Sequence, residues 1–237
     1  MTRGHPDYLK NVGISSEGNF LVGTSIAPIY FEDRCDTPEP LWKIGDGQGA
    51  MLFNYWDDSP PPFGNTVMRL KSNIAGGDDD FSAYKLIGAV PGSRYISFEI
   101  VATFLPSDFY ANRNDAIIPL YFRYFCSTYL MVASISYNPY DESFYVYTGT
   151  PPNYVKIITH GLEKGVWHHL KMIVDFNNKK YISLIVNRTI YDISTYSLYS
   201  EADDDEERNQ ISIIAYSNGV DDCEVNVCRY RVSYNES

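Results

Sequence analysis

The chain of 237 residues has 19 basic and 30 acidic side chains, a net charge of −11, and 44% hydrophobic residues. This balance argues against binding of nucleic acid, which requires clustered Lys and Arg, and against adhesion to anionic lipid. All-β sandwiches often reach this length as one domain, and the 21 tyrosines favour strands over helices.

The first 28 residues differ from the rest in their scattered hydrophobic and many small polar residues. We interpret residues 1–28 as an extended arm that is ordered only if something covers it, followed by one sandwich domain over residues 29–237. The arm has no apolar region or cleavage site typical of a secretory signal. No apolar run approaches about 20 residues, so no membrane insertion is predicted.

From about residue 66 onward, apolar and polar residues alternate in short runs, and helical periodicity is nearly absent. Turn residues separate these runs, as at 138–139, 150–152 and 218–219. This pattern predicts an antiparallel β-sandwich of the jelly-roll type. The predicted strands are residues 95–104, 117–125, 129–137, 143–149, 153–159, 168–176, 181–187, 188–194, 211–217 and 223–234.

Two adjacent histidines, His168 and His169, open one of these strands. Alternation places them on opposite faces, with Leu170 and Met172 on an apolar face, so the pair cannot jointly bind a metal. We interpret the histidines as structural side chains, hydrogen-bonded or solvated at the start of a hairpin.

The four cysteines, Cys35, Cys126, Cys223 and Cys228, are scattered, and the last two lack the C-x-x-C spacing of a metal or redox site. This arrangement favours buried or idle thiols, with one disulfide as the alternative and a metal site as the least favoured.

Three segments carry a resemblance to a known fold family. The run GVWHHLKMIVDFNNKKYISLIVN (residues 165–187) resembles the concanavalin A-like jelly rolls, including laminin-G-type modules. The segments YFEDRCDTPEPLWKIGDG and GVDDCEVNVCRYRVSY look like those of sandwich carbohydrate-binding modules. The resemblance covers residues 29–234 and implies that the first and last strands pair. The resemblance specifies the fold and not the activity, because lectins, lyases, hydrolases, adhesion modules and virion proteins share this fold.

Acidic residues near both ends are the candidate metal ligands. In the resembled modules, carboxylates on the paired terminal strands commonly hold a structural calcium, and Ca²⁺ prefers carboxylate and carbonyl oxygens. If the terminal strands pair, Glu32 and Asp33 come near Asp221 and Asp222. Acidic loops without a metal are the favoured alternative, and the sequence requires no cofactor.

Glycan binding in such sandwiches uses aromatic platforms, because the apolar face of a sugar stacks on a ring. Aromatic residues in sheets also form core and cross-strand pairs, and Tyr and Arg also serve subunit interfaces. The candidate glycan-binding residues are Trp42, Tyr55, Trp56, Tyr121, Arg123, Tyr145 and Tyr147.

One acidic run, EADDDEER, matches the E-x-D-x-x-E spacing of the laminarinase-like hydrolases of this fold through Glu201, Asp203 and Glu206. In those enzymes the carboxylates lie along one strand, at the short separation that a retaining mechanism requires. Here the intervening residues include no strand former, so a solvated loop is favoured. No nucleophile elbow, metalloprotease helix or phosphate loop is present. The chain is predicted not to be an enzyme.

Three functions remain. The favoured one is a non-catalytic subunit of a virion or surface assembly, decorating a capsid or associated with a tail, in a homo-oligomer or particle and with glycan adhesion as a compatible activity. The alternative is a stand-alone carbohydrate-binding module or lectin, and a polysaccharide hydrolase or lyase is least favoured. The expected location is a virion or an extracellular surface reached without a signal peptide, or the cytoplasm if neither applies.

Overall fold

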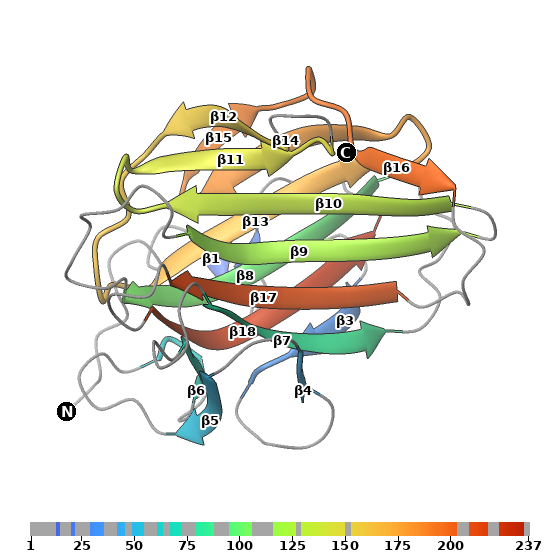
Figure 1. The fold of residues 1–237 in the computed structure, drawn as a ribbon. Coiled ribbons are helices and arrows are strands. Elements are labelled where there is room, and N and C mark those ends of the chain that lie inside the picture. The colour runs from blue at the N-terminus through green and yellow to red at the C-terminus, as the bar shows by residue number, and fades with distance from the viewer. Residues whose placement is uncertain are drawn as a thin grey trace.

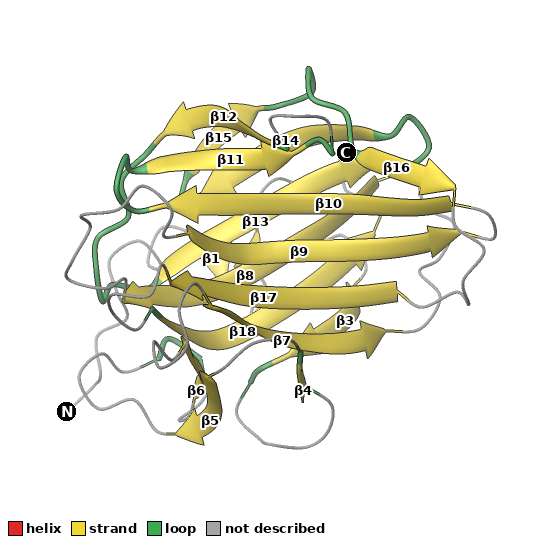
Figure 2. Cartoon of the chain, in the orientation of Figure 1, coloured by secondary structure: helices red, strands yellow, loops and turns green. Residues whose placement is uncertain are grey.

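The protein is an all-β sandwich in the computed structural model, in which residues 13–14, 20–21, 29–35, 42–45, 49–54, 61–63, 67–72, 79–87, 95–105, 116–126, 129–149, 153–202, 209–217 and 223–234 are described. The described residues form strands, turns and loops and no helix (Figure 2). Two antiparallel sheets of eight strands each are stacked on one another (Figure 1). The predicted fold class is therefore confirmed.

We call the two layers the front sheet and the back sheet, after their positions in Figure 1. The front sheet has the order β12 (Tyr154–Thr159), β11 (Ser143–Tyr147), β10 (Tyr129–Asn138), β9 (Ala116–Cys126), β17 (Asn209–Ser217), β7 (Asp79–Ile87) and β4 (Lys43–Ile44), and β16 (Tyr199–Ala202) also pairs with β10. The back sheet has the order β15 (Thr189–Asp192), β14 (Lys180–Val186), β13 (His168–Asp175), β8 (Tyr95–Leu105), β18 (Glu224–Tyr234), β6 (Val67–Ser72) and β5 (Gly49–Asn54), and β3 (Ile29–Asp33) also pairs with β18.

Alternating apolar side chains fill the space between the sheets. Phe98 and Ile100 point inward from β8, and Leu120 and Phe122 point inward from β9; all four are fully buried. The rings of Phe98 and Phe122 meet across the layers with their centroids 4.4 Å apart. Burying a side chain of this size contributes about 2 kcal/mol relative to leaving it exposed.

The first and last strands of the sandwich pair, as the resemblance implies. In the register of β3 and β18, Asp33 lies opposite Tyr230. The rest of the same β18 edge pairs with β6, while the other edge pairs with β8. β18, near the C-terminus, is thus a central strand of the back sheet and pairs with β3 and β6 from the N-terminal part of the chain.

The predicted arm, residues 1–28, falls mostly outside the described residues. Within it, β1 (Gly13–Ile14) and β2 (Phe20–Leu21) pair with each other, and β1 lies behind β8 and β13 in Figure 1. The arm itself stays a prediction. No helix in the described part of the chain is long and apolar enough to cross a membrane.

Two acidic strands are among those that were not predicted. β7 begins in an acidic stretch, Asp78–Asp80, and β16 includes Glu201, the first residue of the acidic run. Both strands pair with long neighbours in the front sheet, β17 and β10. Pairing with a neighbour thus overrides the weak strand preference of acidic residues.

Candidate functional site

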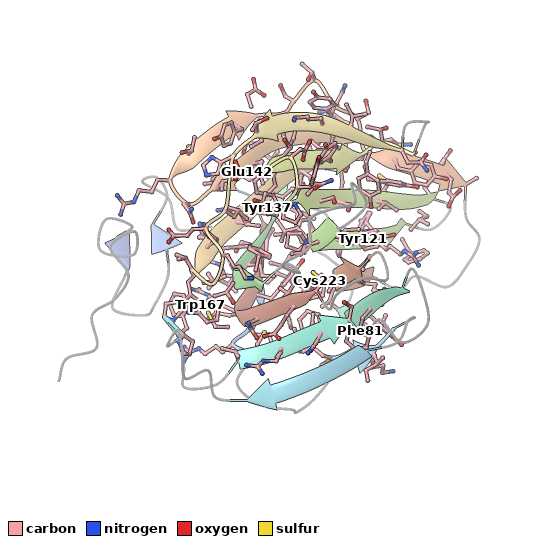
Figure 3. All side chains as sticks on the ribbon, turned by 60° about the vertical axis from the view of Figure 1, so that its left-hand side comes forward. Phe81, Tyr121, Tyr137, Glu142, Trp167 and Cys223 are labelled. Atoms are coloured by element: carbon pink, nitrogen blue, oxygen red, sulfur yellow. The ribbon has the colours of Figure 1, made fainter. Side chains whose placement is uncertain are left out.

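The outer face of the front sheet, which points away from the back sheet, is rich in tyrosine. Alternation along β9 buries Leu120 and Phe122 in the core and leaves Tyr121 and Arg123 on the outer face (Tyr121 is labelled in Figure 3). Neighbouring strands add further aromatic and polar side chains. We call this set the tyrosine face: Tyr84, Tyr121, Arg123, Ser134, Asp141, Tyr145, Tyr147, Tyr154, Lys156, Tyr199, Glu201, Gln210 and Ser212.

Strand register places five members of the tyrosine face in one row. Ser212 of β17 lies opposite Tyr84 of β7 and opposite Tyr121 of β9. Tyr121 in turn lies opposite Ser134 of β10. Tyr147 of β11 continues the row, because the residue before it pairs with the residue after Ser134. Rings and hydroxyl groups therefore alternate across five neighbouring strands, which lie about 4.8 Å apart.

Three tyrosine rings meet at one end of this row. The ring centroid of Tyr147 is 5.2 Å from that of Tyr154 and 5.5 Å from that of Tyr199, with an interplanar angle of 73° for the second pair. The Tyr199 hydroxyl donates a hydrogen bond of 2.5 Å to Glu201. The Tyr147–Tyr199 pair is therefore edge to face, the Tyr147–Tyr154 pair is tilted, and neither pair is stacked flat.

Polar groups beside the row are held by short-range contacts. Arg123 donates from Nε to the Tyr121 hydroxyl (3.0 Å), and its guanidinium carbon is 5.5 Å from the Tyr121 ring centroid. Gln210, which lies opposite Arg123, donates from Nε2 to Ser212 Oγ (2.9 Å). The Arg123 side chain is exposed, so a positive charge stands on this face beside the central tyrosine.

A carboxylate and an ammonium group compensate each other near the outer strands. Asp141 accepts hydrogen bonds at Oδ2 from the Tyr145 hydroxyl (2.5 Å) and from Lys156 Nζ (3.2 Å). Partial burial by itself raises the pKa of Asp141, but these two bonds outweigh it, and the net pKa is lowered. Burial and Asp141 raise the pKa of Tyr145 to about 12. Tyr145 is therefore neutral and Asp141 is charged at physiological pH.

The hydroxyl groups of Tyr147 and Tyr154 also stay protonated. Burial raises the pKa of Tyr154 to about 12, with further increases from Tyr121 and Tyr147 and an opposing effect of Ser134. The pKa of Tyr147 is raised by burial and by Tyr121. Ser134 is fully buried in the middle of the row, and its Oγ makes no hydrogen bond of good geometry with the described residues. The protonated tyrosine hydroxyls can donate and accept hydrogen bonds, whereas the buried Ser134 hydroxyl lies beneath the rings.

Four of the seven predicted glycan-binding residues, Tyr121, Arg123, Tyr145 and Tyr147, lie on the tyrosine face. Trp42 does not. It is 8% exposed, its Nε1 donates to Asp33 Oδ2 (3.1 Å), and its ring contacts Tyr230 in the core. The platform role predicted for Trp42 is therefore corrected to a packing role. Tyr55 and Trp56 lie outside the described residues.

The other members of the tyrosine face were not predicted as glycan-binding residues, and three of them show why. Tyr154 lies in a predicted strand and is opposite Tyr147 in the neighbouring strand. Pairing these two predicted strands as a hairpin would have placed it on the same face as Tyr147. Ser134 carried no signal, because serine is common on either face of a strand. Tyr199 lies in β16, which was not predicted, so only the pairing of β16 with β10 reveals it.

The predicted calcium ligands are only partly described. Asp221 and Asp222 lie outside the described residues. Glu32 contacts Arg229 (3.1 Å), whereas Asp33 contacts Lys85 (2.6 Å). Consecutive residues of β3 point to opposite faces, so Glu32 and Asp33 do not converge on one ion. Within the described ranges, no group of three or more His, Cys, Asp or Glu is arranged to hold a metal.

The carboxylates of the acidic run are also only partly described. Glu201 lies in β16 opposite Leu130 and accepts the Tyr199 hydrogen bond. Asp203 and Glu206 lie outside the described residues. The prediction of a solvated loop is therefore corrected for Glu201 and Ala202, which belong to a strand because β10 offers its edge to them.

The two histidines point to opposite faces of β13, as predicted. His168 stacks on Phe104, with ring centroids 6.2 Å apart, and its Nε2 lies 2.9 Å from the carbonyl oxygen of Glu163. Burial lowers the pKa of His168, which keeps it neutral. His169 is fully buried on the other face, with Nε2 3.5 Å from Glu99. Neither histidine is solvated.

Through Glu99, His169 contacts a buried charged row on the outer face of the back sheet. Strand pairing places Lys171 opposite Glu99, Glu99 opposite Arg231, and Arg231 opposite Glu32. Arg231 Nη2 is 2.5 Å from Glu99 Oε2, and both side chains are at most 5% exposed. Burial by itself raises the pKa of Glu99, but His169 and Arg231 lower it well below its ordinary value. This row balances charge inside the protein and offers no open site.

The described cysteines are buried, as the favoured interpretation expects. Cys35, Cys223 and Cys228 are each at most 2% exposed, and burial raises the pKa of Cys228 far above its ordinary value. The side chain of Cys126 lies outside the described part.

Comparison with known proteins gives a fold and no family. No family model matches the chain, and no curated protein matches it in sequence. A carbohydrate esterase from the Shiga toxin-encoding bacteriophage phi24B is similar in structure, with a TM-score of 0.55 and 12% identity over 89% of this chain and 100% of the other. A seed lectin from Lotus tetragonolobus has a TM-score of 0.54 and 9% identity over 87% and 99% of the two chains.

Two further structures complete the comparison. Peanut lectin, solved with a 9mer peptide, has a TM-score of 0.53 and 11% identity over 85% of this chain and 95% of the lectin. A sialidase matches with a TM-score of 0.46, and this chain covers only 16% of that enzyme's length. The lectin likeness agrees with the two stacked sheets and with the pairing of the terminal strands. The protein therefore has the concanavalin A-like jelly-roll fold.

Proposed function

We propose that the protein binds carbohydrate on the tyrosine face. The observation that carries this proposal is the row in which tyrosine rings of β7, β9 and β11 alternate with serines of β17 and β10. Rings offer surfaces for the apolar faces of sugars, and the partly exposed tyrosines, Arg123 and Gln210 offer polar groups to sugar hydroxyls. The two serines are buried and set the spacing between the rings. The lectins among the structural neighbours make carbohydrate the first ligand class to test.

The length of the row favours a chain of sugars over a single sugar. From β7 to β11 the row crosses four strand spacings, or about 19 Å, which is about the length of four sugar units. Asp141 is paired with Lys156, and the Glu201 carboxylate accepts a hydrogen bond from Tyr199 while Arg123 carries the opposite charge on the same face. A mostly neutral, extended oligosaccharide fits these features best.

We also propose that binding occurs without bond cleavage. Asp141 and Glu201 are the carboxylates of the tyrosine face. They are held at opposite ends of β10: Glu201 lies opposite Leu130, and Tyr145, the partner of Asp141, lies opposite Ser136. Six residues of strand separate these positions, which is about 20 Å. Glycosidases place their two carboxylates about 5–10 Å apart.

The proposal is tested by glycan-array screening followed by titration calorimetry with the best oligosaccharide. Tyr121→Ala and Tyr147→Ala are each expected to weaken binding about tenfold, because each removes one stacking ring. Tyr140→Ala is the matched control, since Tyr140 is 48% exposed in the turn after β10 and outside the row. Absence of binding by the folded wild-type protein, or equal losses in all three variants, would overturn the proposal.

We further propose that such binding serves adhesion of a virion or surface assembly, as the sequence reasoning favours. The virion or surface assembly, the homo-oligomeric state and the extracellular location need a separate test. Chromatography with light scattering reports the oligomeric state, and co-sedimentation with particles from the source organism reports association. A monomer that never joins a particle but still binds glycan would leave the stand-alone lectin as the function.

A further inference from the structure

Tyr181 crosses the sandwich from the back sheet to the front sheet. It lies in β14, where it pairs with Val174, and its side chain is fully buried. Its hydroxyl accepts a hydrogen bond from the backbone N–H of Ser134 (3.0 Å) and donates one to the backbone carbonyl of Tyr147 (2.8 Å). A core side chain thus ends on the backbone that carries the tyrosine face.

The two backbone groups mark a gap in strand pairing. One edge of β10 pairs with β16 through residues 129–132 and with β11 through residues 135–138. Between these segments, Ser134 pairs with neither strand. A buried backbone N–H without a partner is costly, and the Tyr181 hydroxyl supplies the partner that the ladder lacks here.

The strand ends at this gap carry two rings of the tyrosine face. Tyr147 is the last residue of β11, and Tyr199 is the first residue of β16. The two rings contact each other, and the Tyr199 ring also packs against Gly149, where an added Cβ would lie 1.8 Å from the ring. The positions of both rings therefore depend on how the two strand ends are held.

We propose that Tyr181 is a positioning residue for the tyrosine face. Its hydroxyl holds Ser134 and Tyr147 together at the junction of β10, β11 and β16, and thereby keeps the rings of Tyr147 and Tyr199 in the arrangement that binds sugar. The backbone N–H of Tyr181 donates to the carbonyl of Tyr196 (3.2 Å), three residues before β16 begins. One residue thus connects the core to both strand ends. The binding part of this inference rests on the proposed carbohydrate binding.

The test is Tyr181→Phe, which removes the hydroxyl and keeps the ring. The matched control is Tyr230→Phe, because Tyr230 is also fully buried between the sheets and its hydroxyl has no hydrogen-bond partner among the described residues. We expect Tyr181→Phe to bind the oligosaccharide about five- to tenfold more weakly. Hydrogen exchange of the Ser134 amide, followed by NMR, is expected to accelerate about tenfold. Tyr230→Phe is expected to leave both quantities at their wild-type values.

The outcomes separate this inference from the proposed function. Wild-type affinity in Tyr181→Phe, or unchanged exchange at Ser134, would overturn the positioning role. If the wild-type protein binds no glycan, the proposed function fails. The ring contact between Tyr147 and Tyr199, measured by nuclear Overhauser effects in wild type and Tyr181→Phe, then decides the positioning role alone. If Tyr181→Phe does not fold, 4-aminophenylalanine at position 181 is used instead, and wild-type exchange at Ser134 with this residue supports the role.

Discussion

Glu99 is a buried carboxylate with strongly perturbed surroundings. It lies on the outer face of the back sheet at 1% exposure, with Arg231 and His169 in contact and Arg229 and Lys171 nearby. Its pKa is lowered despite burial because His169, Arg231 and Arg229 favour the charged carboxylate. Removing one partner of such a pair leaves the other charge buried without compensation.

Glu99→Gln is expected to lower the free energy of unfolding by about 3 kcal/mol at neutral pH. Because the folded-state pKa lies below the ordinary value of 4.5, the contribution of Glu99 is fully present above that value. It is lost as the pH falls from 4.5 toward the folded-state pKa. Urea unfolding at several pH values should therefore show the difference from wild type shrinking in acid.

The exposed Glu163 offers the control for this substitution. Glu163→Gln is expected to change the free energy of unfolding by less than about 0.5 kcal/mol. A difference between Glu99→Gln and wild type that stays constant from neutral to acidic pH would contradict the assignment of the stabilisation to the charged form.

At the scale of elements, the junction of β10, β11 and β16 decides how the tyrosine face is built. Two strands share one edge of β10, and the chain leaves β11 through Gly149, which has a φ of 71°. Glycine is required there for two reasons: the positive φ, and the Tyr199 ring at the position of a Cβ.

Gly149→Ala is therefore expected to displace Tyr199 and to lower the free energy of unfolding by about 2 kcal/mol, of which about 1 kcal/mol comes from the positive φ. Gly165, with a φ of 72°, is the control for the backbone contribution alone. Thermal and urea unfolding of the two variants give the comparison. If Gly149→Ala and Gly165→Ala lose the same stability and glycan binding is unchanged, the ring contact at Gly149 is unimportant.

At the scale of the whole molecule, the two outer faces of the sandwich differ. The outer face of the back sheet buries a charged row, whereas the outer face of the front sheet presents half-buried tyrosines and the exposed Arg123. Binding is therefore expected on one face only, and over a length set by the number of strands crossed.

Affinity is expected to rise with the number of sugar units in a linear oligosaccharide and to level off at about four, the length of the row from β7 to β11. Calorimetry with a series from one to six units gives this dependence. Tyr84→Ala, at the far end of the row from Tyr147, should weaken binding of the longer members and leave the shortest ones unaffected. Equal affinity for one unit and for four would contradict an extended ligand.

The sequence by itself determined the strands from residue 95 onward, apart from β16, and the alternation of faces within them, because alternation is a local property. The runs around Tyr121 and Tyr147 were predicted as strands, and both residues were predicted as binding residues. The same reasoning placed Trp42 on a platform, because nothing local shows that Asp33 and Tyr230 surround it. Residues that pack against distant segments cannot be assigned to core or surface from their own neighbours in the chain.

Only the tertiary structure decided which strands lie side by side. It joined Tyr84, Tyr121 and Tyr147 to serines of β17 and β10 in one row, and it placed the Tyr181 hydroxyl in the gap beneath them. The physical reason is that register between strands far apart in the chain is set by the packing of the whole core, whereas alternation within a strand is set by the geometry of the backbone.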